Sequence, residues 1–313
     1  MNSIGPKTAW GLGLDAGGTA TRWQLVDGHG RAHARGEVAG WSASQLGTLQ
    51  QPVLDAALLE LAAALRDLPR PTRLYAGLTG CDGSASDPPG PLHERLAHAL
   101  GLEASAVILV SDIELACRAL FAPGRGILVL AGTGSIAAHL RADGSLERAG
   151  GRGSLLDDGG SGYWIAREAL RGVWRREDAK PGAWQSSRLA HELFAQIGDT
   201  SWARTREFVA AASRGELGAL ATAVAAAARA GDADAHALLH RAGSELARLA
   251  LALAARCGAH PVVLAGRVPL LDERIVVALR NALAPGTALT LAQPDAAHAA
   301  ALLALGRMPP LLA

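Results

Sequence analysis

The sequence contains little cysteine: only Cys81, Cys117 and Cys257 occur among its 313 residues. No two of them have the CxxC spacing of a zinc site or a redox motif. A disulfide framework, a structural zinc site and a cysteine-ligated iron–sulfur cluster are therefore not expected. Isolated thiols in a reducing cytoplasm are the expected state.

The chain also lacks a charge imbalance and a long apolar run. Its formal net charge is +1, so no nucleic-acid partner is expected. The most apolar stretches, 217–230 and 246–255, are shorter than the roughly 20 residues of a membrane span, and the first ten residues lack the apolar centre of a signal peptide. With 50% hydrophobic residues, the sequence predicts a cytoplasmic protein of one large or two medium domains.

Two segments of the chain follow the same plan at low identity. One is GLGLDAGGTATRWQLVDGHG (11–30), and the other is GILVLAGTGSIAAHLRADGSLERAGG (126–151). Each has an apolar strand, a glycine-rich turn, a second apolar strand and an Asp-Gly pair typical of a hairpin. Gly18 aligns with Gly134 and Asp27 with Asp143, in both cases 116 positions on. This agreement predicts an internal duplication.

The elements expected after each repeat also agree in order, because helical and strand periodicities alternate in both halves. In the first half they are a helix at 49–68, a strand at 73–78, a helix at 91–100, a strand at 106–110 and a helix at 113–121. In the second half a long helical block at 161–257 precedes a strand at 261–265, a helix at 270–283, a strand at 288–291 and a helix at 295–305.

A third segment, GGRGSLLDDGGSGYWIAREAL (150–170), narrows the choice of protein family. It resembles the GGWG…GDEGSxYWI segment of the N-acetylglucosamine kinase family, which is grouped with the BadF/BadG/BcrA/BcrD-type ATPases in the actin-like ATPase and sugar kinase superfamily. The resemblance implies an α/β fold of two duplicated ribonuclease H-like domains with a cleft between them. Each domain would be a mixed five-stranded sheet with flanking helices, and a homodimer is expected.

The resemblance also implies domain boundaries. Residues 1–122, with a C-terminal helix of about 295–313, would form the N-terminal actin-like ATPase domain. Residues 123–294 would form the C-terminal domain, with the helices of 161–257 inserted into it.

The first glycine-rich turn is a candidate phosphate and metal site. Gly17 and Gly18 let backbone N–H groups approach phosphate oxygens because no Cβ blocks them. Thr19 adds a hydroxyl donor, and Asp15, at the end of the strand, would hold Mg²⁺ through water. An ordinary tight turn with a turn-favouring aspartate is the alternative.

The second glycine-rich turn, Gly132, Thr133 and Gly134, would contact the ATP phosphates. Its sequence GTGSIA also fits a dinucleotide-binding fingerprint, which requires a helix directly after the turn. Residues 136–140 instead have the pattern of a strand, which favours the ATPase interpretation. No GxxxxGK[ST] phosphate loop occurs in the sequence.

Asp112 is the candidate general base. It follows Ser111 at the end of the strand AVILV and at the start of a helix, and ligands of such sheets bind beyond the carboxyl ends of the strands. The Ser-Asp pair also resembles the catalytic aspartate motif of the family. Both residues suit a helix N-cap, so Ser111 could cap while Asp112 accepts a proton from a sugar hydroxyl.

The resemblance assigns sugar recognition to the second half of the chain. The turn of Gly151, Arg152 and Gly153 would face the sugar, Ser135 would lie near it, and the carboxylate of Asp158 would accept hydrogen bonds from its hydroxyls. A flexible loop that caps the following helix is the alternative. Separately, Gly266, in VLAGR, would let adenine or ribose lie on the backbone, although a plain turn is as good an explanation.

Several sugar contacts of the family differ in this chain, which leaves the identity of the sugar open. The differing positions are Ser44, Leu46, Ile136, Arg152, Asp157 and Gly159.

The leading interpretation is an ATP- and Mg²⁺-dependent kinase for a hexosamine, most of all N-acetylglucosamine at its primary hydroxyl. Another amino sugar, such as glucosamine or N-acetylmuramic acid, is an alternative. A BadF-type ATPase without sugar kinase activity, a sugar-sensing regulator and a kinase that has lost turnover are the rivals. The expected partner is a small-molecule sugar, and neither a nucleic acid nor a membrane is expected.

Overall fold

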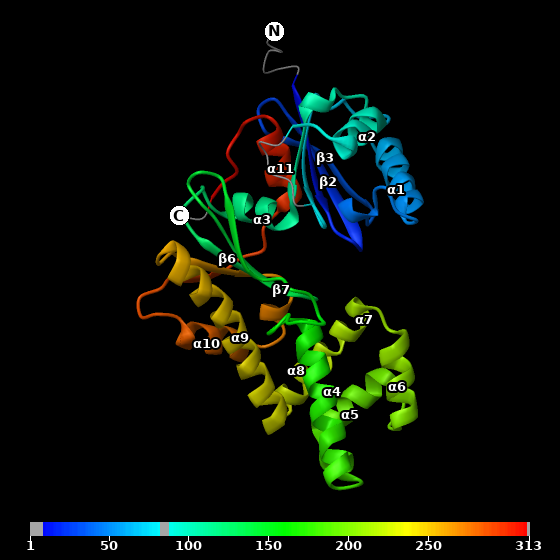
Figure 1. Ribbon diagram of the computed structural model, residues 1–313, viewed down its shortest axis with the longest axis vertical. Coiled ribbons are helices and arrows are strands. Elements are labelled where there is room, and N and C mark those ends of the chain that lie inside the picture. Colours follow the sequence, from blue (N-terminus) through cyan, green and yellow to red (C-terminus); the bar gives the residue numbers. More distant parts are fainter. Residues whose placement is uncertain (1–8, 82–87, 312–313) are drawn as a thin grey trace. The chain divides into compact units, whose positions relative to one another are not determined.

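The computed structural model describes residues 9–81 and 88–311. The first eight residues, the segment 82–87 and the last two residues of the expected C-terminal helix lie outside this description. The chain divides into two compact units: unit 1 comprises Met1–Pro123 and Pro294–Ala313, and unit 2 comprises Gly124–Gln293. Each unit contains one mixed five-stranded sheet with flanking helices (Figure 1), which confirms the expected fold class.

The sheet of unit 1 has the strand order β3-β2-β1-β4-β5. Its strands are β1 (Trp10–Ala16), β2 (Ala20–Asp27), β3 (Ala32–Ala39), β4 (Arg73–Leu78) and β5 (Val107–Ser111). The first three are antiparallel neighbours, whereas β1, β4 and β5 run parallel. The carboxyl ends of these three parallel strands therefore share one edge of the sheet.

Side-chain alternation along β1 explains how helices cover both faces of this sheet. Leu12 and Leu14 point into a core with α1 (Gln51–Ala64) and α2 (Pro91–Leu100). Gly11 and Gly13, which alternate with them, face α11 (Ala296–Ala304). A Cβ on Gly13 would lie 2.1 Å from the carbonyl oxygen of Ala297, so only glycine permits this close packing. The helix α3 (Asp112–Leu120) packs beside α11 (Figure 1).

The sheet of unit 2 repeats this topology with the order β10-β9-β6-β7-β8. Its strands are β6 (Ile127–Ala131), β7 (Ser135–Leu140), β8 (Leu146–Gly150), β9 (Val262–Ala265) and β10 (Leu289–Leu291). The long helix α9 (Ala233–Cys257) lies across β6, β7 and β8, and α10 (Glu273–Ala282) packs on α9.

Five further helices of unit 2 lie between β8 and α9: α4 (Gly162–Ala179), α5 (Arg188–Ile197), α6 (Trp202–Ala211), α7 (Arg214–Ala219) and α8 (Ala221–Arg229). A serine side chain accepts a backbone hydrogen bond at the start of α4, α5, α6 and α7, which is why these helices begin where they do. The alanine-rich α8 and α9 contribute buried faces to one core. Within the described residues, no helix is both long and apolar enough to cross a membrane.

The duplication is present, but its register differs from the constant offset of 116. The last pair before the first turn is Ala16 with Thr21, and the corresponding pair in unit 2 is Ala131 with Ser135. The offset is therefore 115 before the turn and 114 after it, because the second turn is one residue shorter. The expected constant offset of 116 is accordingly wrong.

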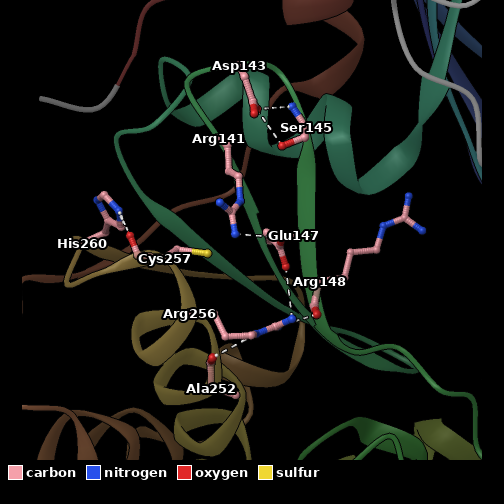
Figure 2. Close-up of polar contacts among 9 residues, drawn as sticks. All are labelled: Arg141, Asp143, Ser145, Glu147, Arg148, Ala252, Arg256, Cys257 and His260. Atoms are coloured by element: carbon pink, nitrogen blue, oxygen red, sulfur yellow. Dashed lines mark hydrogen bonds and ion pairs between the residues drawn. The ribbon is translucent and has the colours of Figure 1, made fainter.

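The second hairpins show the same shift. In unit 1 the N–H of Asp27 donates to the carbonyl of Arg31, and in unit 2 the N–H of Arg141 donates to the carbonyl of Ser145. Asp143 therefore lies inside its turn, where its carboxylate accepts hydrogen bonds from the backbone and hydroxyl of Ser145 (Figure 2). Asp27 instead ends its strand. The spacing of the two Asp-Gly pairs thus agreed by coincidence.

Figure 2 also shows how this hairpin is fastened to α9. Glu147 on β8 accepts hydrogen bonds from Arg141 and from Arg256 near the end of α9. Arg256 donates in addition to the carbonyl oxygen of Arg148. These contacts hold the far end of the hairpin, away from its glycine-rich turn.

Candidate active site

Three polar side chains lie at the ends of the three parallel strands of unit 1. Asp15 is the penultimate residue of β1, Thr79 follows β4, and Asp112 follows β5. The hydroxyl of Thr79 donates to Oδ2 of Asp112 over 2.7 Å, and the N–H of Thr79 donates to the carbonyl of Ala16 over 2.9 Å. The parallel topology thus brings residues separated by nearly a hundred positions to one edge.

Asp112 is fixed at the start of α3 by both of its carboxylate oxygens. Oδ1 accepts the N–H of Ile113 over 2.8 Å, and Oδ2 accepts the hydroxyl of Thr79. Ser111 accepts the N–H of Glu114 and is the N-cap residue of α3. The predicted division of roles, in which Ser111 caps and Asp112 does not, agrees with this geometry.

The carboxyl of Asp15 lies close to other acids in a half-buried position. Burial raises its pKa above the ordinary value. Arg22, 3.8 Å away, lowers the pKa, whereas the charges of Asp112 and Asp295 raise it. A carboxyl beside like charges at a strand end fits the position of a cation held partly through water. The described residues contain no group of three His, Cys, Asp or Glu side chains placed to bind a metal ion.

Two serines extend this edge of unit 1. Ser42 donates to the carbonyl of Thr79 over 2.9 Å, and its hydroxyl lies 2.9 Å from that of Ser44. Gly80 makes this approach possible, because a Cβ there would lie 2.7 Å from the hydroxyl oxygen of Ser42. Ser44, one of the positions where the family pattern differs, is therefore linked through Ser42 to the backbone of Thr79.

The first glycine-rich turn leaves room for a ligand. The N–H of Gly17 donates to the carbonyl of Ala20 and closes the turn. Gly18 and Thr19 are exposed, and a Cβ on Gly18 would have no heavy atom within 4 Å. The turn is therefore not held by packing around Gly18, and its backbone is accessible to phosphate oxygens.

The second glycine-rich turn, in unit 2, is held from behind by helix α4. The N–H groups of Gly162 and Tyr163, at the start of α4, donate to the carbonyls of Gly132 and Thr133 over 2.8 and 3.3 Å. In the described part of the chain, the N–H groups of Thr133 and Gly134 have no acceptor. Unpaired N–H groups on a turn that faces the positive end of a long helix are suited to an anion. A strand follows the turn, so the dinucleotide-binding alternative does not hold.

Gly266 lies directly against this turn. Its φ angle is +98°, and a Cβ would lie 2.2 Å from the carbonyl oxygen of Ala131, the last residue of β6. Both facts require glycine. The carbonyl of Gly266 accepts a hydrogen bond from the side chain of Gln293 over 2.7 Å.

A cavity of about 360 Å³ opens beside these residues within unit 2. This volume is in the range of ligand pockets, roughly 300–1,000 Å³. One wall is the second turn, and another is the segment after Gly266. The lining residues are Gly132, Thr133, Gly162, Gly215, Gly218, Ala219, Ala221, Thr222, Arg267, Val268, Leu270 and Leu271. A mainly apolar pocket with unpaired N–H groups at one end fits a flat heterocycle that carries a phosphate chain.

The residues expected to contact the sugar lie behind or beside the second turn. Ser135 is buried and donates to the carbonyl of Gly159 over 2.7 Å. Asp158 is 3% exposed and accepts a hydrogen bond from Arg214 over 2.7 Å. Both polar groups are thus engaged within the protein, and their role as sugar contacts stays a prediction.

The turn of Gly151, Arg152 and Gly153 lies at the surface. Both of its glycines have positive φ angles, of 65° and 82°, and Arg152 is exposed. Leu155 and Leu156 follow it and are also exposed. Unlike Ser135 and Asp158, this predicted sugar-facing turn is exposed to solvent.

Sequence reasoning missed two parts of the site. Thr79 could have been found, because Thr-Gly follows a predicted strand that is parallel to those ending at Asp15 and Asp112. The second missed part is the wall of the cavity formed by α7, for which the sequence gave a weaker signal. Gly215 and Gly218 are three residues apart inside a helical stretch, where glycine is disfavoured.

Comparison with known proteins shows the family of the chain. The family model described as "BadF/BadG/BcrA/BcrD ATPase family" matches residues 12–304. The chain belongs to this ATPase family. The match extends over both sheets, so both glycine-rich turns of the chain lie within it.

Individual relatives of this BadF-type ATPase carry kinase names. A curated N-acetylmuramic acid/N-acetylglucosamine kinase of Clostridium acetobutylicum is 35% identical over 74 residues, and this match spans 24% of each chain. A solved structure from Chromobacterium violaceum, provisionally named an N-acetylglucosamine kinase, is 28% identical with a TM-score of 0.71, and the match covers 96% of this chain and all of that one. A similarly named structure from Porphyromonas gingivalis (19% identity, TM-score 0.68, 92% and 96% coverage) shows the shared fold.

Proposed function

We propose that this chain transfers the γ-phosphoryl group of ATP to a hydroxyl of a hexosamine, with N-acetylglucosamine and its primary hydroxyl as the leading substrate. The observation that carries the proposal is the fixed carboxylate of Asp112. It lies at the carboxyl end of a parallel strand, and one of its oxygens accepts a hydrogen bond from Thr79. The chain belongs to an ATPase family, and a solved structure similar to it carries the name of a sugar kinase.

Asp112 is the general base in this proposal. The sugar hydroxyl donates its proton to the carboxylate as its oxygen attacks the γ-phosphorus, and ADP leaves. Thr79 and the N–H of Ile113 hold the carboxylate still, so little reorganisation is needed when the proton moves. Asp112 also orients the hydroxyl, because a carboxylate accepts hydrogen bonds but does not donate them.

The two glycine-rich turns hold the nucleotide. The unpaired N–H groups of Thr133 and Gly134 bind phosphate oxygens, and the apolar cavity beside Gly266 receives the adenosine. Gly17, Gly18 and Thr19 offer a second set of donors. Bound Mg²⁺ would neutralise charge on the phosphates, and Asp15 is the residue that would hold it. A homodimer and a cytoplasmic location are further expectations of the proposal.

The identity of the sugar rests on the relatives rather than on the contacts. The Clostridium acetobutylicum relative is named for both N-acetylmuramic acid and N-acetylglucosamine. In this chain Ser44 is linked through Ser42 to the backbone of Thr79, and Arg152 lies in the turn of 151–153. Changed hydrogen-bonding residues can shift discrimination between sugars by large factors.

A product assay tests the proposal. Purified protein is incubated with Mg²⁺ and ATP and with N-acetylglucosamine, N-acetylmuramic acid, glucosamine, N-acetylmannosamine or glucose. Phosphorylated sugar is identified by mass spectrometry and ³¹P NMR, and ADP is measured in parallel. A 6-phosphate of an amino sugar, formed with equal ADP, supports the proposal. ADP release in every tube, including the one without sugar, would indicate an ATPase instead.

A further inference from the structure

Asp158 has an unusual backbone conformation. With φ at +60°, it is the one residue other than glycine with a positive φ angle in the described part of the chain. Side chains of L-residues are strained in this region. A strained conformation of this kind persists only where the surrounding structure holds it. Glycine would adopt this conformation without strain but has no carboxylate, so the contacts of the Asp158 carboxylate are the feature to examine.

That carboxylate lies beside Gly134 of the second glycine-rich turn. A Cβ on Gly134 would lie 3.2 Å from Oδ2 of Asp158 and 3.3 Å from Oδ1. The carboxylate thus occupies the space that a side chain at position 134 would need. The neighbouring carbonyl of Gly159 accepts the hydroxyl of Ser135, which ties the same segment to the first residue of β7, directly after the turn.

A buried negative charge at this position opposes the binding of phosphate to the turn. Arg214 compensates it: its guanidinium donates to Oδ2 of Asp158 over 2.7 Å. Arg214 is the first residue of α7, and Gly215 and Gly218 of α7 line the cavity next to Gly132 and Thr133.

Resting on the proposed binding of ATP at this turn, we infer that the Asp158–Arg214 ion pair is a positioning device that supports the second phosphate turn and neutralises the charge beside it. Asp158 supplies the support, and Arg214 makes the support compatible with a polyphosphate. Both residues act through the turn, and neither needs to touch the nucleotide.

This inference predicts opposite effects for two substitutions. Arg214→Gln leaves the buried carboxylate of Asp158 unpaired beside the turn, so ATP affinity falls by about tenfold because the remaining charge repels the phosphates. Asp158→Asn keeps the shape and removes the charge, so ATP binds at least as tightly as to the wild type. The double variant Asp158→Asn/Arg214→Gln binds ATP more tightly than Arg214→Gln alone.

The charge of the ligand separates this mechanism from a structural one. Affinities for adenosine, AMP, ADP and ATP are measured by calorimetry on the full chain, with thermal unfolding of each variant as a check on folding. For Arg214→Gln the loss should grow along that series and stay under about threefold for adenosine, because repulsion scales with phosphate charge. Arg204→Gln, which breaks the exposed Arg204–Glu207 pair, is the matched control and should change nothing.

Equal losses for adenosine and ATP, or an Asp158→Asn variant that loses ATP affinity, would overturn the inference. If Arg214→Gln does not fold, Asp158→Asn still tests the inference, because its ATP affinity should stay the same or rise. Wild-type protein that binds no adenine nucleotide would instead overturn the proposed function, and the two failures are therefore distinguishable.

Discussion

The hydroxyl of Thr79 donates a hydrogen bond of 2.7 Å to the carboxylate of Asp112. The two residues follow adjacent parallel strands, β4 and β5, so the strand register itself sets their distance. The backbone of Thr79 is in turn fixed by Ala16 and Ser42. The proposed base therefore has its orientation determined by the sheet.

Replacing Thr79 tests whether that orientation matters. Thr79→Val keeps the shape but leaves Oδ2 of Asp112 without its donor, and we expect kcat to fall by roughly 10- to 100-fold, as for a hydrogen bond to a charged group. Thr79→Ser restores the donor and should recover most of the rate. Steady-state kinetics with saturating ATP measures both. Equal rates for Thr79→Val and wild type would show that Asp112 is oriented by other contacts.

Gly132→Ala tests the phosphate turn without disturbing the fold. A Cβ at this position has no heavy atom within 4 Å in the structure, yet it would fill space at the mouth of the cavity. We expect the Kd for ATP to rise about tenfold or more, with an unchanged melting temperature. Gly90→Ala, also in open space but far along the chain at the start of α2, serves as the control. An unchanged Kd would place the nucleotide elsewhere.

Asp15 should lower the stability of the ligand-free protein. Its pKa in the folded chain is raised above 3.8, mainly by burial, so the ionised form is less favourable in the fold than in the unfolded chain. The wild type therefore loses stability as pH rises from 3.8 through the raised pKa. Asp15→Asn should be the more stable protein at pH 7, and the two should converge below pH 3.8.

Denaturant unfolding across this pH range, without nucleotide or Mg²⁺, measures the effect. Asp67→Asn, at an exposed carboxyl, is the control and should follow the wild type. An Asp15→Asn variant that is less stable at pH 7 would mean that the pair with Arg22 outweighs the cost of burial.

Two helical glycines should respond oppositely to alanine. A Cβ on Gly243 of α9 would lie 2.2 Å from the carbonyl oxygen of Ile275 on α10, so Gly243→Ala should destabilise unit 2 by about 1–3 kcal/mol through overpacking. Gly172 of α4 has open space around its Cβ position, and Gly172→Ala should stabilise by about 1 kcal/mol through helix propensity. Urea unfolding distinguishes them. Stabilisation by both would show that α9 and α10 are not in close contact.

Much of the fold could be predicted because each local signal had a physical cause. The alternation in GLGLDA places leucines on one face of β1 and glycines on the other, and the spacing of apolar residues marked the helices of both units. The strand after Gly134 followed from its alternating pattern and the turn after it. The exact register of the duplication could not be predicted, since the shorter turn at 132–134 changes the offset without changing the pattern of glycines.

The site was harder to predict than the fold. Asp15 and Asp112 could be found because each ends a strand, but the hydrogen bond to Thr79 depends on which strands are neighbours. The burial of Ser135 and Asp158 could not be read from the sequence at all. The partner of Asp158 is Arg214, which lies 56 residues further along the chain and reaches it only through the fold of the inserted helices.

The most direct test of the account compares wild type with Asp112→Asn in sugar-dependent ADP release, at saturating Mg²⁺, ATP and N-acetylglucosamine, with ATP affinity measured for both. The account predicts that the rate falls by about 10²- to 10⁴-fold, the usual contribution of a general base, while the Kd for ATP stays within about twofold. Sugar phosphorylation that survives in Asp112→Asn at the wild-type rate would contradict the assignment of the base and, with it, the proposed mechanism.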